Sequence, residues 1–319
     1  MIFHVINYVF GRKIALLSLL LMMLTRVSAQ QDVSFAHYWA LEPSFNPAAI
    51  GKQQLINVTG AYAMSMAGFE NNPKTMFVAA DMPIYMLNGY HGVGLQLMSD
   101  DIGLFKHQRL TAQYAYKLSL LGGTLSIGLQ ASMLSEKFKG SELDLRDEDP
   151  HLQKADVTGT AFDLAAGLYY MHRNWYAGFS VQHAMEPEVE LGEKSIIDVA
   201  RTYYFTGGYN IRLHNPFFTI HPSVLARTDG VGYRVDVTAR VKYSFEKRMF
   251  YAGVAYSPTN SVTALIGGNF HGISIGYSYE AYTSALSFKH GSHELFVGYQ
   301  TELDLVKKGR NKHQSVRIL

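Results

Sequence analysis

The sequence contains no cysteine, so a disulfide framework, a thiolate metal site and a cysteine nucleophile are all excluded. Charge is also scarce, because Asp, Glu, Lys and Arg make up 17% of the 319 residues, against about 25% in an average soluble domain. Beyond the N-terminus no run is apolar enough to span a membrane as a helix. The chain instead has 13% aromatic residues, 28 glycines and 21 tyrosines, which indicates β-structure with many turns.

The N-terminus has the order of a secretory signal peptide. Arg12 and Lys13 precede a largely apolar run at residues 14–24, and the small residues Ser28 and Ala29 follow. This run is too short for a membrane-spanning helix, which needs about 20 residues, so we expect cleavage after Ala29 rather than an uncleaved anchor. Without the three basic residues of this leader the chain carries 25 basic and 26 acidic side chains. A near-neutral chain without a basic stripe is not expected to bind nucleic acid.

Alternation of apolar with small or polar residues is the recurrent pattern of the remaining chain. In YRVDVTARVKY, at residues 233–243, Tyr, Val and Ala alternate with Arg, Asp, Thr and Lys without a slip, which is the period of a β-strand. The same period predicts fourteen strands, near residues 54–62, 74–82, 92–99, 105–118, 124–134, 161–171, 175–183, 203–211, 219–228, 233–243, 249–256, 262–269, 273–280 and 293–300.

Two architectures share this pattern. In a soluble sandwich the apolar face points into a core, whereas in an outer-membrane barrel it meets lipid. The signal peptide, the aromatic residues at the ends of the apolar rows and the connection lengths favour the barrel. The longest connections, 135–160 and 184–202, are both odd-numbered, and most short ones are even-numbered, with connections 9 and 11 as exceptions. We therefore predict an all-β, transmembrane outer-membrane β-barrel of about fourteen antiparallel strands, with both termini in the periplasm.

The predicted organisation has four parts. They are a signal peptide at residues 1–29, an N-terminal periplasmic or plug-like segment at 30–53, the β-barrel at 54–300 and a basic C-terminal tail at 301–319. From residue 306 onward the tail carries five Lys and Arg residues and no acid. It is either a disordered end or an electrostatic contact for a periplasmic partner.

The segment before the first predicted strand, QDVSFAHYWALEPSFNPAAIG, carries a motif. Its residues are Gln31, Asp32, Phe35, Tyr38, Asn46, Pro47 and Gly51. In these residues the chain resembles the PorP/SprF family of Bacteroidota outer-membrane proteins. Further groups follow in family order, at residues 73–75, 100–103, 125–129 and 292–299. In one place the chain departs from the family, which usually has an Arg-Gln-Trp-like group where residues 61–68 read AYAMSMAG.

The resemblance implies a non-enzymatic component of the type IX secretion and gliding machinery in the cell outer membrane. Its implied partners are the periplasmic ring and lipoprotein of that machine and exported or surface-anchored proteins such as adhesins. The seven motif residues are then candidate partner contacts. The alternative is a FadL-like transporter of hydrophobic small molecules, a family that also has fourteen strands and an Asn-Pro-Ala group near its N-terminus. That family uses a longer N-terminal hatch than the two dozen or so residues available here.

The polar face of residues 233–243 is a second candidate site, predicted to face the barrel lumen. Its charged members are Arg234, Asp236, Arg240 and Lys242. They could form a selectivity or docking surface for a peptide segment. Alternatively, charges of both signs pair across strands and fill the interior, as in other small barrels, with Asp163 and Glu294 as possible partners of the cations.

No residue pattern predicts a catalytic, cofactor-binding or metal site. The chain has no nucleophile elbow, zinc-protease helix or phosphate loop, although a triad assembled across strands would leave no sequence signature. The acidic cluster at residues 142–149 matches no calcium-loop pattern and is expected to be a solvated loop. His290 and His293 have no third ligand nearby in the sequence, so no metal is assigned.

Overall fold

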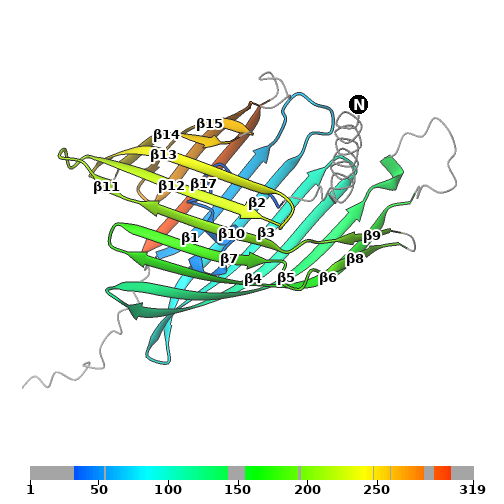
Figure 1. Cartoon of the computed structure of the whole chain (residues 1–319), viewed down its shortest axis with the longest axis horizontal. Coiled ribbons are helices and arrows are strands. Elements are labelled where there is room, and N and C mark those ends of the chain that lie inside the picture. The colour runs from blue at the N-terminus through cyan, green and yellow to red at the C-terminus, as the bar shows by residue number, and fades with distance from the viewer. Residues whose placement is uncertain are drawn as a thin grey trace, which may run out of the picture.

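Fourteen antiparallel strands close into one barrel, as predicted (Figure 1). The computed structural model describes residues 32–53, 55–142, 155–192, 195–246, 248–258, 260–283 and 291–302. The barrel strands are β1 (Leu55–Met64), β2 (Lys74–Met86), β3 (Gly89–Ile102), β4 (Phe105–Leu120), β5 (Gly123–Phe138), β6 (Val157–His172), β7 (Trp175–Gln182), β10 (Thr202–Tyr209), β12 (Phe218–Thr228), β13 (Tyr233–Phe245), β14 (Arg248–Ser257), β15 (Ser261–Phe270), β16 (Ile273–Tyr282) and β17 (Ser292–Glu302).

Each barrel strand pairs with the barrel strands before and after it in the chain. The ring closes where β1 pairs with β17, from Leu55 opposite Glu302 to Met64 opposite His293, and β10 joins β7 to β12. Closure leaves no unpaired strand edge in the barrel.

Shorter elements lie in the connections between these strands. A hairpin of β8 (Glu188–Leu191) and β9 (Ser195–Asp198) occupies the connection after β7, where the sequence pattern predicts no strand. β11 (Ile211–Arg212) extends the pairing of β12, and the 3₁₀ turn η3 (Gly140–Glu142) follows β5. Among the described residues, no helix has the length and apolar character to cross a membrane.

The two faces of the strands differ as their alternation predicts. On β13 the outward side chains of Val237 and Val241 are 50% and 45% exposed, whereas the inward Thr238 and Arg240 are 0% and 4% exposed. The same holds around the ring, where large apolar side chains such as Leu95 point outward. An apolar outer surface over a polar interior is the arrangement that suits a barrel in a lipid bilayer.

The two ends of the barrel differ in their connections. Five of the six even-numbered connections have two residues, and they meet at what we call the turn end. The backbone φ angles of Leu87 and Asn88 in the first of these turns are both positive, as a tight hairpin with a type I′ turn requires. Pairs of aromatic rings lie beside these turns, for example Tyr170 with Trp175 at 5.3 Å, as expected where rings lie at the headgroup level. The β8–β9 hairpin lies at the opposite, loop end (Figure 1).

Candidate functional site: the plug and the cavities beside it

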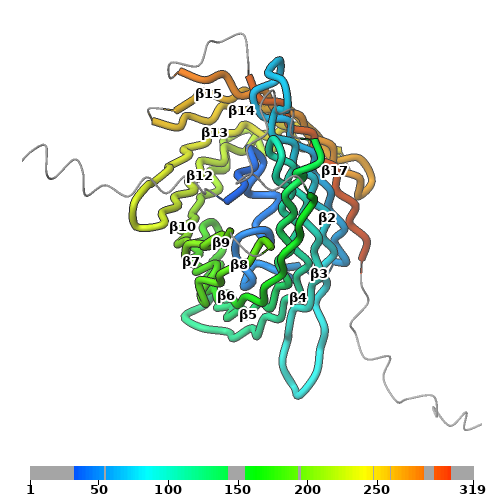
Figure 2. Tube along the Cα trace, turned by 90° about the vertical axis from the view of Figure 1, so that its right-hand side faces the viewer, coloured from blue at the N-terminus to red at the C-terminus, as the bar shows by residue number. Residues whose placement is uncertain are grey.

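Residues 32–51, called the plug from here on, lie inside the ring of strands (Figure 2). Two 3₁₀ turns fold this segment, η1 at Glu42–Ser44 and η2 at Pro47–Ala49. Each turn has a proline in its first residues, where a fixed φ favours the turn and no backbone N–H is needed. The Asn46 side chain caps η2 by accepting a hydrogen bond from Ala48 N at 2.9 Å. Proline and asparagine therefore give the plug its compact shape locally.

One wall carboxylate, Glu294 on β17, holds the middle of the plug. Its oxygens accept hydrogen bonds from Ala36 N at 2.5 Å and from His37 N at 3.0 Å. Nδ1 of the His37 ring lies 2.6 Å from the same carboxylate. His37 and Glu294 are buried and Ala36 is partly buried, and hydrogen bonds to a buried charged group are the stronger kind. Glu294 thus acts as a clamp on the plug backbone, whereas its inward position in the sequence predicts a partner for cations.

A second ionic anchor holds the start of the plug near the loop end. The Asp32 carboxylate lies 3.1 Å from His183 Nε2 and accepts a hydrogen bond from the Tyr204 hydroxyl at 2.8 Å. Nδ1 of His183 lies 2.9 Å from Asp163, and Arg227 donates to the Asp32 carbonyl oxygen. Burial acts to lower the pKa of His183, but the two carboxylates outweigh it and raise the pKa to about 9. At neutral pH the imidazolium is therefore charged and holds both carboxylates.

Wall side chains also bind the plug through its backbone carbonyls. The donors are amides and a hydroxyl on β3, β4 and β7, and they come in two pairs: Gln96 and Gln113 donate to Pro43 O at 2.9 and 2.8 Å, and Ser180 and Gln182 donate to Phe45 O at 2.6 and 2.7 Å. Buried carbonyls need such partners. These bonds depend on the path of the plug backbone rather than on its side chains.

Glycines on the inner face of the wall let the plug approach closely. A Cβ atom at Gly128 would overlap the backbone of Pro47 and Ala48, and one at Gly167 would overlap the Asn46 side chain. Glycine weakens a strand, so it is usually found where another backbone comes near. The small second face that the sequence shows along these strands is therefore the surface on which the plug lies.

Aromatic packing fills the remaining contacts between plug and wall. Phe35 packs against Phe77 with ring centroids 5.6 Å apart, and Phe45 stacks on Tyr204 at 5.4 Å. The guanidinium of Arg240 lies over the Trp39 ring, 3.7 Å from its centroid, which is cation–π geometry.

A cavity of about 450 Å³ remains at the loop end, between the start of the plug, the ends of β3 to β5 and the segment after β9. Its lining is mixed, with the polar residues Asp100, His107, Arg109, Glu136 and His183 and the apolar residues Val33, Met98, Ile102, Phe105, Leu134, Ile197 and Val199. Cavities of this size accommodate small ligands or a few side chains of a partner.

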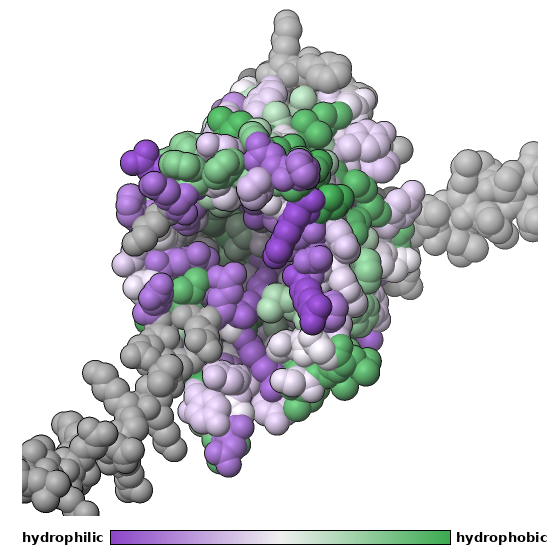
Figure 3. All heavy atoms as spheres, turned by 90° about the vertical axis from the view of Figure 1, so that its left-hand side faces the viewer, coloured by the Kyte–Doolittle hydropathy of each residue, from purple (hydrophilic) through white to green (hydrophobic). Residues whose placement is uncertain are grey.

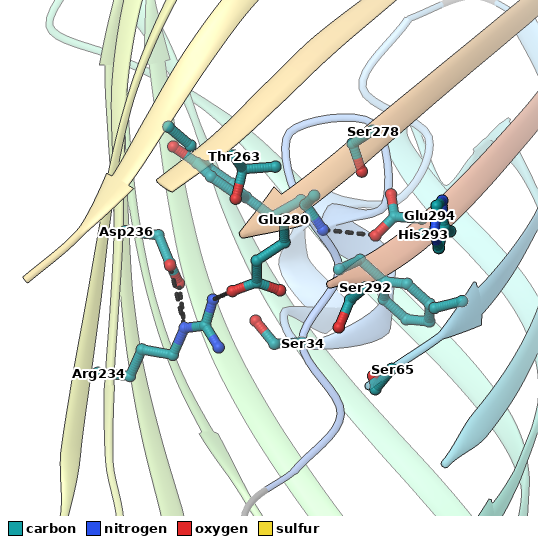
Figure 4. Close-up of a pocket in the computed structure, with 15 residues that line it drawn as sticks. Ser34, Ser65, Arg234, Asp236, Thr263, Ser278, Glu280, Ser292, His293 and Glu294 are labelled. Carbon is teal, nitrogen blue, oxygen red and sulfur yellow. Dashed lines mark hydrogen bonds and ion pairs between the residues drawn. The ribbon is translucent and has the colours of Figure 1, made fainter. Parts of the chain in front are cut away.

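A second cavity lies across the plug, among β13 to β17 (Figure 4). Arg234 lies there between two carboxylates, with its Nε 3.0 Å from Asp236 and its Nη2 2.9 Å from Glu280. The free volume is about 30 Å³, enough for water and little more. This part of the lumen is therefore filled by charge pairs, one within β13 and one between β13 and β16.

The sequence motif and the predicted lumen row both fall inside the barrel. Six motif residues lie in the plug, where Phe35, Tyr38, Asn46, Pro47 and Gly51 are buried and Asp32 binds His183. A direct contact of these residues with a partner stays a prediction. The charged row faces the lumen, and its members have different partners: Arg234 and Asp236 pair with each other, whereas Arg240 and Lys242 have no ion-pair partner among the described residues.

Several sequence expectations fall outside the described residues. These are the signal peptide at residues 1–29, Gln31, residues 143–149 of the acidic cluster, His290 and the tail from residue 303 onward.

Apart from Arg240, which stacks on Trp39, the wall residues described above as holding the plug are not among the predicted site residues. Gln96, Gln113 and Gln130 lie 17 residues apart on three successive strands, and Gln130 also donates to Gln182 at 2.9 Å. This regular spacing of an amide on inward positions is a signal that sequence analysis could have used.

Comparison with known proteins gives a family. The model of the family described as "Type IX secretion system membrane protein PorP/SprF" matches residues 27–299. No curated protein matches the chain.

Several solved structures are similar. A Pseudomonas aeruginosa FadL homologue is 11% identical and covers 81% of this chain and 93% of its own, with a TM-score of 0.49. The CymD monoaromatic hydrocarbon channel is 10% identical, with 82% and 92% covered and a TM-score of 0.49. A triple mutant of the Rhodopseudomonas blastica porin is 10% identical, with 77% and 99% covered and a TM-score of 0.32. Similarity at this level transfers no ligand or partner to this chain.

Proposed function

Because the chain belongs to the PorP/SprF family of type IX secretion system membrane proteins, we propose that it is a closed binding component of that machine in the outer membrane. In this proposal the barrel passes no polypeptide through its lumen. It holds exported or surface-anchored proteins at its loop end and contacts periplasmic parts of the machine at its turn end. Its activity is binding rather than catalysis.

The observation that carries this proposal is the attachment of the plug to strands all around the ring. Glu294 on β17, Gln113 on β4 and Gln182 on β7 each bind its backbone. Tyr38 adds a hydroxyl contact to Ser223 on β12 at 2.8 Å. A segment bonded on opposite sides of the lumen blocks a moving chain, so partners are expected to bind at the ends of the barrel.

The loop end offers the larger binding surface. Among the described strands, β8 and β9 pair only with each other, and Ile196 on β9 is 60% exposed. Beside it lies the cavity of about 450 Å³. An unpaired strand edge beside a partly apolar cavity suits an extended segment of a partner, which would pair along the edge and place side chains in the cavity.

The motif residues support this function indirectly in our proposal. Phe35, Asn46 and Pro47 fix the plug in the wall, and a fixed plug keeps the loop end in one shape. Contact of machine partners with the buried part of the plug, residues 35–51, would need the plug to leave the lumen.

The experiment is deletion of the gene, complementation and measurement of the surface and secreted protein profiles by mass spectrometry. We expect that deletion removes a set of proteins from these fractions and that the wild-type gene restores them. A gene in which residues 188–198 are replaced by a short Gly-Ser linker should not restore them, although its barrel still shows heat-dependent gel migration. The matched control replaces residues 229–232, the connection between β12 and β13, in the same way and should restore export.

A second candidate function is favoured by the apolar part of the loop-end cavity, to which Phe105, Leu134 and Val199 contribute. Such a lining suits a transporter of hydrophobic small molecules. Normal export in the deletion strain, together with lost uptake of hydrophobic small molecules, would contradict the secretion role and support transport.

A further inference from the structure

Three residues that can carry positive charge lie side by side on the lumen face of two strands. His221 on β12 stands directly opposite Arg240 on β13, and Lys242 is the next inward residue of β13. No ion pair of the described residues includes any of them. Arg234 on the same strand differs, because it is held by Asp236 and Glu280. Arg240 and Lys242 lie two residues apart on the same face of β13, so two like charges share this part of the lumen without a counter-charge among the described residues.

Arg240 is the most deeply buried of these three residues. It is 4% exposed, and its Nε and Nη1 atoms are buried with no hydrogen-bond partner in the described part of the chain. Its stacking on Trp39 fixes the position of the guanidinium without neutralising it. A buried charge without a partner is strongly unfavourable, which a bound anion would correct.

Buried hydroxyl groups also lie next to Arg240. Thr238 Oγ1 and the Tyr176 hydroxyl meet no described residue in full hydrogen-bond geometry, although Tyr176 lies near the hydroxyls of Thr206 and Ser223 and Thr238 lies near that of Tyr38. The strand register places both residues in one row around the wall, because Tyr176 is opposite Gly208, Gly208 opposite Ser223 and Ser223 opposite Thr238. The Tyr176 ring lies over Gly208, where no side chain blocks its hydroxyl from reaching toward β12 and β13. These hydroxyls can donate to an anion that the cations attract.

We propose that Tyr176, His221, Thr238, Arg240 and Lys242, together called the cationic patch, form a binding site for an oxyanion, either free phosphate or a carboxylate of a polypeptide. Arginine and hydroxyl donors around one point suit an oxyanion, whose several oxygens accept hydrogen bonds at once. Neither the family match nor the proposed function assigns such a site.

Access to the cationic patch is from the turn end. Lys242 lies nearer that end than Arg240 and is only partly buried. Figure 3 looks onto the end of the barrel on the left in Figure 1, where the β6–β7 turn lies, and shows hydrophilic side chains around a hollow. An anion on the periplasmic side would therefore reach the patch without passing the plug.

The test uses the full-length barrel purified in detergent and titrated with sodium phosphate by calorimetry, with ionic strength held constant by sodium chloride. We expect saturable binding by the wild type and a weakening of at least tenfold in Arg240→Gln and in Lys242→Gln. The matched control is Arg234→Gln, which removes a lumen arginine of the same strand that already has carboxylate partners. It should bind phosphate within twofold of the wild type.

Two further measurements identify the anion and guard against misfolding. If a Glu-rich peptide displaces phosphate at a lower concentration than acetate does, the site is assigned to a polypeptide carboxylate. If phosphate binds and the peptide does not displace it, the site is assigned to the free anion. Heat-dependent gel migration checks that each variant is folded, and Lys242→Gln carries the test if Arg240→Gln does not fold. The proposal is overturned if the folded wild type binds neither phosphate nor peptide, or if the patch variants bind as well as the wild type.

Discussion

Replacement of Glu294 by alanine should release the middle of the plug while the barrel stays folded. The change removes the acceptor of two backbone N–H groups, at 2.5 and 3.0 Å, and of the His37 ring at 2.6 Å. A hydrogen bond to a charged group contributes about 1.5–3 kcal/mol. Three bonds at the lower figure would add to about 4.5 kcal/mol, and because bonds that share one acceptor are not fully additive, we use about 4 kcal/mol in total.

The assay is hydrogen exchange of the amides of residues 36–41, followed by mass spectrometry. A loss of about 4 kcal/mol in local stability corresponds to exchange faster by roughly 1,000-fold, since about 1.4 kcal/mol is a factor of ten. Glu294→Gln keeps one oxygen acceptor, so it should lose about half of this free energy and speed exchange by roughly 30-fold. Barrel folding is checked by heat-dependent gel migration.

The control for this prediction is Glu280→Ala on the neighbouring strand β16. Glu280 is also a lumen carboxylate, but it binds the wall residues Arg234 and Ser261 rather than the plug. It should leave exchange of residues 36–41 near the wild-type rate. Wild-type protection of these amides in folded Glu294→Ala would refute the clamp.

Three other substitutions or conditions test separate parts of the structure. Gly128→Ala should speed hydrogen exchange of the amides of residues 46–50, because its Cβ would overlap the backbone of Pro47 and Ala48. Gly60→Ala should not, because the nearest atom to a Cβ at Gly60 is 3.7 Å away. Equal exchange in the two variants would contradict the close approach of plug and wall. Val237→Arg should impair barrel assembly, since arginine on the lipid face costs about 2–4 kcal/mol at the bilayer midplane. Arg240→Ala, on the lumen face, should still assemble. An equal loss of the heat-modifiable gel band in both variants would show that the two faces are misassigned. Because the pKa of His183 is raised from 6.5 to about 9, its contribution of about 3 kcal/mol is complete below pH 6.5 and lost as the pH rises through 9. Exchange of residues 32–36, relative to intrinsic rates, should therefore rise between pH 7 and 10 in the wild type, and a rise of the same size in His183→Asn would refute this.

The barrel could be predicted from sequence because the information is local. Alternation of the kind seen at residues 233–243 marks both the strand and its two faces, and all fourteen predicted strands are present. Boundaries are less well defined by alternation. Strand β3 runs from Gly89 to Ile102, beyond the predicted residues 92–99, because pairing with its neighbours continues past the regular pattern.

The contacts of the plug could not be predicted in the same way. His37 and Glu294 are 257 residues apart in sequence, and no periodicity links them. The sequence suggested a plug-like segment from its position and motif, but not which wall residues bind it. Inward glycines such as Gly128 and Gly167 were a usable signal, because a strand face that lacks side chains leaves room for another chain.

The β8–β9 hairpin was missed for a different reason. Val189 and Leu191 alternate with Glu188 and Glu190, but four residues are too few to separate a strand from a loop by period alone. The hairpin is fixed by tertiary packing, since Val189 is fully buried and lies against β6 where Gly159 has no side chain.

The hydrogen bonds to Pro43 O and Phe45 O have a consequence for how the plug could be exchanged. Because the wall recognises carbonyl positions, the covalent link between plug and barrel is not part of that recognition. A barrel expressed from residue 52 onward would keep its glutamine and serine donors without acceptors. A synthetic peptide of residues 30–51, supplied separately, should then bind and restore a closed lumen, which makes the protein a candidate for fragment complementation.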